Sequence, residues 1–293
     1  MTEWHIRYGG RGVMIYWHVE RRAASIYSQL KYCSSSEVAA MIEGVLRHCT
    51  DLEVQKNYVD SHGQSDVAFA FCHLLGFELM PRIKGIASQR HNRPDAGRPD
   101  DYPNLQAILT RPINWELIRK HYDEMIKYAT VLRLGTAQPE EILRRFTRNS
   151  LQHPIYQALD GLGRVVKTIF LCRYLNDEGL RREVQEGLNV VENWNGANSF
   201  IFYGKSGEIA TNRLEDQAVS VLALHLLQAN LVYINTLVFQ QVLEEPGCLE
   251  RLLPEDLRAL SPLIYHHINP YGTFELEMAK RLLIDWGETR LHS

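Results

Sequence analysis

One stretch decides the fold: Lys56-Asn-Tyr-Val-Asp60-Ser-His-Gly-Gln-Ser65-Asp-Val67. A run that favours β-structure ends at Asp60, a polar turn containing Gly63 follows, and Ser65 or Asp66 is placed to cap a new helix. The pattern predicts that Asp60 lies at the carboxyl end of a strand, where α/β proteins usually bind ligands and metals. Two interpretations stay open at this point, a metal-binding carboxylate and a turn aspartate that only starts a helix.

The composition is that of a soluble globular protein, with 45% hydrophobic and 23% charged residues among 293. We find no membrane-spanning apolar run and no signal peptide, so we expect a cytoplasmic protein with no membrane partner. The five cysteines are widely spaced and indicate neither a disulfide framework nor a zinc knuckle. The net charge of −3 argues against binding nucleic acid by bulk positive charge, although clustered arginines could form a local basic track.

The first 83 residues predict the order β-β-α-β-α-β. Residues 11–20 and 25–32 read as a hairpin, and Ser34 to Glu37 form a capping sequence before a helix. The strand that ends at Asp60 comes next, then a helix from Ser65 that ends at Gly76 and a short strand over 77–80.

The character of the chain then changes to helix. Residues 84–112 predict a long loop without periodicity. Helices are predicted from Pro112 to near Gly135, from Gln138, over 154–174 and over 177–188, followed by a polar segment 189–212 with a short strand at 200–203. The longest helix is predicted over 214–243, with an apolar stripe of Val219, Leu222, Leu226 and Ala229 on the side of Glu215, and shorter helices are predicted from Pro254 and after Thr273.

Glu215 lies in the first turn of that longest helix, where a carboxylate is commonly explained by the helix dipole. Together with Asp60 it suggests more, because carboxylate oxygens are the ligands of hard divalent cations. Two such cations, about 3.5–4 Å apart, can activate a water or a 3′-hydroxyl for in-line phosphoryl transfer. That chemistry needs a third acid.

Short motifs in a fixed order resemble those of the carboxyl-terminal catalytic region of Tn-three family transposases. They are Gly10-Arg-Gly-Val-Met-Ile-Tyr-Trp17, Val59-Asp-Ser-His-Gly-Gln-Ser-Asp66, residues 74–82, Leu132-Arg-Leu-Gly-Thr136, Gly163-Arg-Val-Val-Lys-Thr168, residues 174–178 and 207–209, Leu214-Glu-Asp-Gln217, residues 260–263 and residues 267–269. The resemblance covers nearly the whole chain. It implies an RNase H-like fold and a DDE triad that cuts DNA at transposon ends and joins the 3′ ends to target DNA.

The resemblance assigns roles to individual residues. Asp60 would be the second acid of the triad and Glu215 the third, both catalytic metal ligands, and Asp216 is the less favoured candidate for the third acid. Arg82 matches an arginine of the family and is predicted either to contact a DNA phosphate or to form a structural salt bridge. The family further implies Mg²⁺, for which Mn²⁺ can substitute, a homodimer in the full-length proteins, and a bacterial, nucleoid-associated location.

This sequence also departs from the family pattern. The family's first aspartate stands in a Ser-Asp-Gly motif before the first hairpin, and Met1 falls after that point; Glu3 is a poor replacement because it precedes the second strand rather than lying on the first. We therefore expect a truncated transposase that is catalytically silent by itself. The alternatives are a non-catalytic fragment that binds DNA or a full transposase, and a decayed remnant.

These expectations combine into one architecture. We predict an α/β, RNase H-like core that lacks its first strand and carries a large α-helical insertion between the second and third triad acids. Its parts would be a core over 1–83, a linker loop and helical insertion over 84–212, and a region over 213–293 that bears the third acid.

For Asp66 we favour helix capping over metal binding. A DNA-backbone role is plausible for a few of the arginines on the loop and the insertion, namely Arg90, Arg93, Arg98, Arg144, Arg145 and Arg148.

Overall fold

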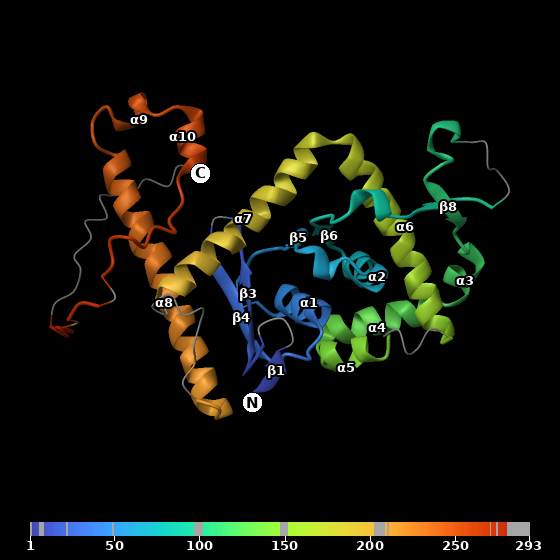
Figure 1. Cartoon of the computed structure of the whole chain (residues 1–293), viewed down its shortest axis with the longest axis horizontal. Helices are drawn as coiled ribbons and strands as arrows, with labels where there is room; N and C mark the ends of the chain where they lie inside the picture. Colours follow the sequence, from blue (N-terminus) through green and yellow to red (C-terminus); the bar gives the residue numbers. More distant parts are fainter. Residues whose placement is uncertain are drawn as a thin grey trace.

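The structure is a computed structural model of the whole chain (Figure 1). It describes residues 2–5, 9–21, 23–48, 50–96, 102–146, 152–201, 209, 211–269, 271–273 and 275–279. Small sheets and many helices give the mixed α/β class that the sequence predicts.

The predicted amino-terminal hairpin is confirmed. Strand β3 (Met14–Val19) pairs antiparallel with β4 (Ser25–Lys31). A separate short pair, β1 (Glu3–His5) with β2 (Gly10–Gly12), precedes it. Helix α1 (Glu37–Arg47) follows, and its amino end is capped by the Ser36 hydroxyl, which accepts a hydrogen bond from the backbone N–H of Ala39.

The deciding stretch folds as predicted. Strand β5 (Lys56–Val59) pairs parallel with β6 (Glu78–Pro81), and they are connected by the 3₁₀ turn η1 (Ser61–Gly63) and helix α2 (Asp66–Leu75). Ser65 caps α2 by accepting from the N–H of Ala68 at 3.2 Å. Gly76 ends α2 at φ 85°, a left-handed conformation that glycine adopts without steric cost.

The segment 84–112 is not the loop without regular structure that its lack of periodicity predicts. It contains β7 (His91–Arg93) and β8 (Leu109–Pro112), which pair parallel, and the 3₁₀ turns η2 (Ile86–Ser88) and η4 (Pro103–Leu105). Strands of three and four residues are too short to display an alternation of apolar and polar side chains.

The helices predicted between residues 112 and 176 are confirmed, with corrected boundaries. The helix predicted from Pro112 to Gly135 is two helices, α3 (Trp115–Lys120) and α4 (Tyr122–Leu134), separated at His121. Helices α5 (Pro139–Arg144) and α6 (Pro154–Asn176) follow as predicted.

Helix α7 (Glu178–Ile201) runs well beyond the predicted end at residue 188, so the prediction of a polar, irregular segment directly after that point is wrong. The strand predicted over 200–203 begins inside this helix, and residues 202 and 203 lie outside the described residues. Tertiary packing explains the longer helix: the polar stretch contains Trp194 and Ala197, which are buried.

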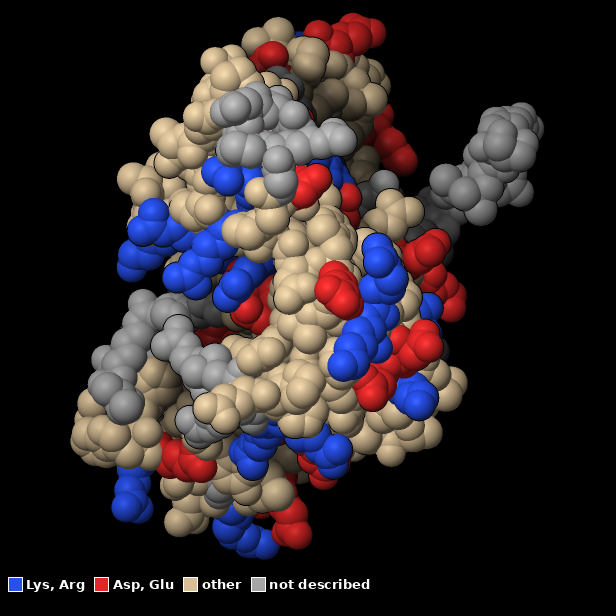
Figure 2. Space-filling view, turned by 90° about the vertical axis from the view of Figure 1, so that its right-hand side faces the viewer, with Lys and Arg blue, Asp and Glu red and all other residues tan. Residues whose placement is uncertain are grey.

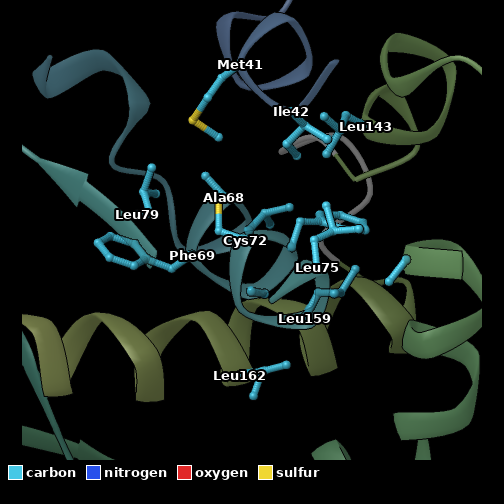
Figure 3. Packing of buried hydrophobic residues seen from close by; sticks show 14 of the residues in the cluster. Met41, Ile42, Ala68, Phe69, Cys72, Leu75, Leu79, Leu143, Leu159 and Leu162 are labelled. Carbon is cyan, nitrogen blue, oxygen red and sulfur yellow. The ribbon is translucent and has the colours of Figure 1, made fainter. Parts of the chain in front are cut away.

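A single hydrophobic cluster joins the α/β part to the insertion. Helix α2 lies at its centre, with Ala68, Phe69, Cys72 and Leu75 among side chains of α1, α5, α6 and β6 (Figure 3). Met41 and Ile42 come from α1, Leu143 from α5, Leu159 and Leu162 from α6, and Leu79 from β6. Because this cluster contains residues of both parts, the insertion supports the segment that carries Asp60.

The longest predicted helix is α8 (Leu214–Leu243), which packs on β4. Its predicted apolar stripe, however, faces outward: Val219, Leu222 and Leu226 are each 65% exposed. The buried side carries polar amides among its aliphatic groups, and Gln228 donates to the Asn198 side chain at 2.8 Å. The helix is apolar on both sides, so the spacing of apolar residues did not identify the buried face.

By length and composition, α8 is also apolar enough to cross a membrane, which corrects our expectation that no segment approaches that limit. A single such helix is weak evidence, since helices of soluble proteins pass the same test.

The chain beyond α8 contains two short helices, α9 (Cys248–Arg251) and α10 (Pro254–Ala259), the second as predicted. Of the helix predicted after Thr273, residues 275–279 are described and are not helical, and residues 280–293 lie outside the described part.

Acidification should destabilise the packing of the hairpin on α1. His18 accepts a hydrogen bond at its Nε2 from the Gln29 side-chain amide at 2.9 Å, so it is neutral in the folded chain. Burial lowers the pKa of His18 from 6.5 to about 4, and nearby His48 adds to the effect. The unfolded chain therefore binds the proton first, and the stability contributed by neutral His18 falls by about 3 kcal/mol between pH 6.5 and 4.

Urea unfolding across this pH range measures the effect. His18→Gln should flatten the pH profile, and the matched variant His267→Gln, at an exposed position, should leave it unchanged. Equal profiles for His18→Gln and the unsubstituted chain would contradict the assignment.

Candidate catalytic site

Asp60 lies where the sequence places it, at the carboxyl end of β5. Its Oδ1 accepts a hydrogen bond from the N–H of Ser61 at 2.6 Å, which caps η1, and the side chain is exposed. Asp60 therefore caps this turn, and because its side chain is exposed, both interpretations of it stay open. Directly beside it, the N–H of Arg82 donates to the carbonyl oxygen of Val59 at 2.9 Å, which fixes the ends of the two parallel strands together.

Helix α7 holds the strand that leads to Asp60. Glu183 accepts hydrogen bonds from the Lys56 ammonium at 2.7 Å and from the Tyr58 hydroxyl at 2.5 Å. These two donors hold the pKa of Glu183 below its usual value, while burial and the nearby Glu183 carboxylate raise the pKa of Tyr58. Gly187 allows this approach, because a Cβ added there would lie 2.6 Å from the Tyr58 ring.

Glu215 lies in the first turn of α8 as predicted, with 85% of its side chain exposed. Its recorded partner is Arg213, whose guanidinium lies 3.4 Å away. The neighbouring Asp216 accepts from the Thr211 hydroxyl at 3.3 Å and lies 3.7 Å from Arg213. Gln217 turns inward instead and donates to the carbonyl oxygen of Thr211 at 2.9 Å.

The structure places Asp60 and Glu215 on separate elements, the end of β5 and the first turn of α8. Helix α8 is anchored to the hairpin through His225, which accepts from the Ser28 hydroxyl at 3.1 Å and donates to the carbonyl oxygen of Ser25 at 3.0 Å. The hairpin lies between α8 and the β5–β6 pair, and α8 begins at the lower end of the molecule (Figure 1). Within the described ranges, no group of three or more histidine, cysteine or acidic side chains could hold a metal ion.

The remaining candidates have local partners. Glu3, the poor replacement for a first acid, accepts a hydrogen bond from the N–H of Ser34 at 2.9 Å. Arg82 lies 3.9 Å from Glu192, at the outer limit of an ion pair, with half of its side chain exposed. Both interpretations of Arg82 therefore remain available. Arg98 and Arg148 lie outside the described residues.

The sequence did not predict one feature of the structure, a charged pocket. A pocket of about 480 Å³ lies beside the start of α2, and its charged lining consists of Asp66, Arg90, Arg111, Arg164 and Lys167. We call it the basic pocket. Its signal was present in the sequence, since Arg164 and Lys167 stand three residues apart on one helix face, but the contribution of the short strands could not be foreseen.

Comparison with known proteins gives the family. Residues 1–274 match the model of the Tn3 transposase DDE domain. The chain belongs to this family, which confirms the resemblance found in the motifs.

The chain is also similar to individual proteins that are described as transposases. The chain is 32% identical over 92% of its length to the transposase for transposon Tn1546 of Enterococcus faecium, and 30% identical over 94% to that for Tn501 of Pseudomonas aeruginosa. It is 31% identical over 92% to the transposase for Tn2501 of Escherichia coli. The chain spans only 27–28% of the length of these relatives.

Proposed function

We propose that this chain is the catalytic region of a DNA transposase that carries out metal-dependent phosphoryl transfer. The reaction of the whole enzyme would be hydrolysis that frees a 3′-hydroxyl at the transposon end, then attack of that hydroxyl on target DNA. The observation that supports the proposal is the family match over residues 1–274, which spans both Asp60 and Glu215.

Asp60 and Glu215 would hold the divalent cation, Mg²⁺ or Mn²⁺. Both have exposed carboxylates, and neither is buried in a strong ion pair, so the donor chemistry fits a hard cation. The bound cation would supply Lewis-acid activation of the attacking oxygen. Because the two side chains stand on separate elements, joint binding of the cation would bring the start of α8 to the end of β5.

Mn²⁺ titration of the full chain, followed by the electron paramagnetic resonance of the free ion, tests the two ligands. Asp60→Ala and Glu215→Ala should each weaken Mn²⁺ binding about tenfold or more, because each removes a charged ligand. Asp51→Ala and Asp216→Ala are matched controls that each remove an exposed acid close in sequence to one of the ligands, and they should leave binding unchanged. If Asp216→Ala weakens binding and Glu215→Ala does not, the third acid has been misassigned.

We further propose that the described strands belong to an RNase H-like sheet. Among the described strands β3 pairs only with β4, and β5 only with β6, which fits a sheet whose first strand would lie between the two pairs. The chain would divide into a core over 1–83, an insertion over 84–212 and a region over 213–293. A first acid on that strand would complete the triad with Asp60 and Glu215.

The partners and location follow from the same proposal. The substrate would be the DNA of the transposon ends and of the target, and Arg82 would contact a phosphate. The protein would act as a homodimer in the cytoplasm, at the nucleoid and without a membrane partner.

A second candidate function is that of a non-catalytic partner of a full transposase. The outward apolar stripe of α8 favours it, because large exposed apolar surfaces usually mark contacts with another protein.

A further inference from the structure

The basic pocket is built by three separate parts of the chain. Arg90 precedes β7, Arg111 lies in β8, and Arg164 and Lys167 lie on α6, around the amino end of α2. The face that carries α3, α6 and β8 shows one group of Lys and Arg side chains at its left and a mixture of both charges elsewhere (Figure 2). The chain's net charge is −3, so this is a local concentration of positive charge.

Internal contacts fix the α6 side of the basic pocket. Lys167 lies 3.3 Å from the Asp66 carboxylate and donates to the carbonyl oxygen of Gln64 at 3.4 Å. Arg164 pairs with Asp160 at 2.6 Å and lies 3.7 Å from Asp66. The single acid of the lining is therefore neutralised by its neighbours, and two cations of the pocket are held in place.

The arginines on the strand side of the basic pocket differ from the α6 side in their ion pairs. Across the part of the chain that the structure describes, no ion pair is recorded for Arg90 or Arg111, and both are exposed. The other lining side chains are neutral hydrogen-bonding groups, namely Ser88, Gln89, Asn92 and Thr110. Unpaired arginines among short hydroxyl and amide groups are the set that proteins use on phosphate and sugar oxygens.

We propose that the basic pocket binds the sugar–phosphate backbone of DNA without reading its base sequence. The proposal rests on the proposed function, and it gives the helical insertion a role in binding DNA beside Asp60. The pocket lies on the same segment as this acid: Gln64, which accepts from Lys167, is four residues beyond Asp60 on the turn into α2.

The full chain tests this with fluorescence anisotropy of a labelled DNA duplex in EDTA, over a range of salt concentrations. Arg90→Ala/Arg111→Ala should weaken binding about tenfold or more and reduce the slope of log K against log salt by about two, because two phosphate contacts are lost. Arg90→Lys/Arg111→Lys retains the charges and should keep most of the slope. The control Arg21→Ala/Arg182→Ala removes two cations that are 75% and 73% exposed on other elements, and should bind like the unsubstituted chain.

Several results would overturn the proposal. They are an unchanged affinity and slope in Arg90→Ala/Arg111→Ala, an equal loss in the control, or displacement of the duplex by micromolar inorganic phosphate, which would indicate a small-anion site. Binding in EDTA does not depend on the metal, so failure of the metal assignment and failure of the basic pocket are separate outcomes. A chain that binds no duplex at low salt would contradict the basic pocket as a DNA site.

Discussion

Gly163→Ala should lower the free energy of unfolding by about 3 kcal/mol or more, although alanine in a helix interior is normally more stable than glycine by about 1 kcal/mol. Helix α6 crosses α2 so closely at this point that a Cβ on Gly163 would overlap the carbonyl oxygen of Asp66. The obstacle is backbone, which cannot rotate away as a side chain could. The two helices would have to separate, and the hydrophobic cluster between them would lose contacts.

The same helix provides the matched control. A Cβ at Gly161 would meet only Ile118, at 3.4 Å, which is an ordinary van der Waals contact. Gly161→Ala should therefore leave stability unchanged or raise it by up to about 1 kcal/mol. Urea unfolding followed by circular dichroism measures both variants. If Gly163→Ala is as stable as Gly161→Ala, the close crossing of α6 and α2 is not real.

Trp194→Ala should cost about 3–5 kcal/mol, because it empties the centre of the second hydrophobic cluster. Trp194 is 1% exposed, and its indole N–H donates to the carbonyl oxygen of Ala23 at 2.9 Å. The cluster joins the turn of the hairpin to α7 and to Leu263 beyond α10. Losing this side chain should loosen the hairpin, α7 and the carboxyl-terminal segment together.

Trp194→Phe separates the two contributions. Phenylalanine fills most of the volume but leaves the Ala23 carbonyl without its donor, at a cost of about 1–3 kcal/mol. Trp4→Ala is the control, since Trp4 is 62% exposed and its removal should change stability by less than about 0.5 kcal/mol. Guanidinium unfolding measures all three, and a small effect of Trp194→Ala would show that this cluster contributes little to stability.

Local signals in the sequence predicted the elements whose ends they determine. Ser36 and Ser65 accept the capping hydrogen bonds expected of them, and Gly76 takes the left-handed conformation that ends α2. These interactions join residues no more than four positions apart, so sequence reasoning can find them. The position of Asp60 followed from the same local chemistry.

The features that could not be predicted from the sequence depend on tertiary contacts. The length of α7 depends on Gly187 against Tyr58 and on Trp194 in its cluster, both far away in sequence. The buried face of α8 depends on amides such as Gln228, which pack inside because they find hydrogen-bond partners there. The approach of Asp60 to Glu215 is a contact of this long-range kind, and it remains a proposal.

The outward stripe of α8 has a practical consequence for handling the protein. Val219, Leu222 and Leu226 present branched aliphatic groups to water along one side of a long, straight rod. In a concentrated preparation we expect this side of the helix to associate with other copies, and salting-out agents should strengthen that association. Dilute samples in low-sulfate buffer should therefore keep this self-association to a minimum.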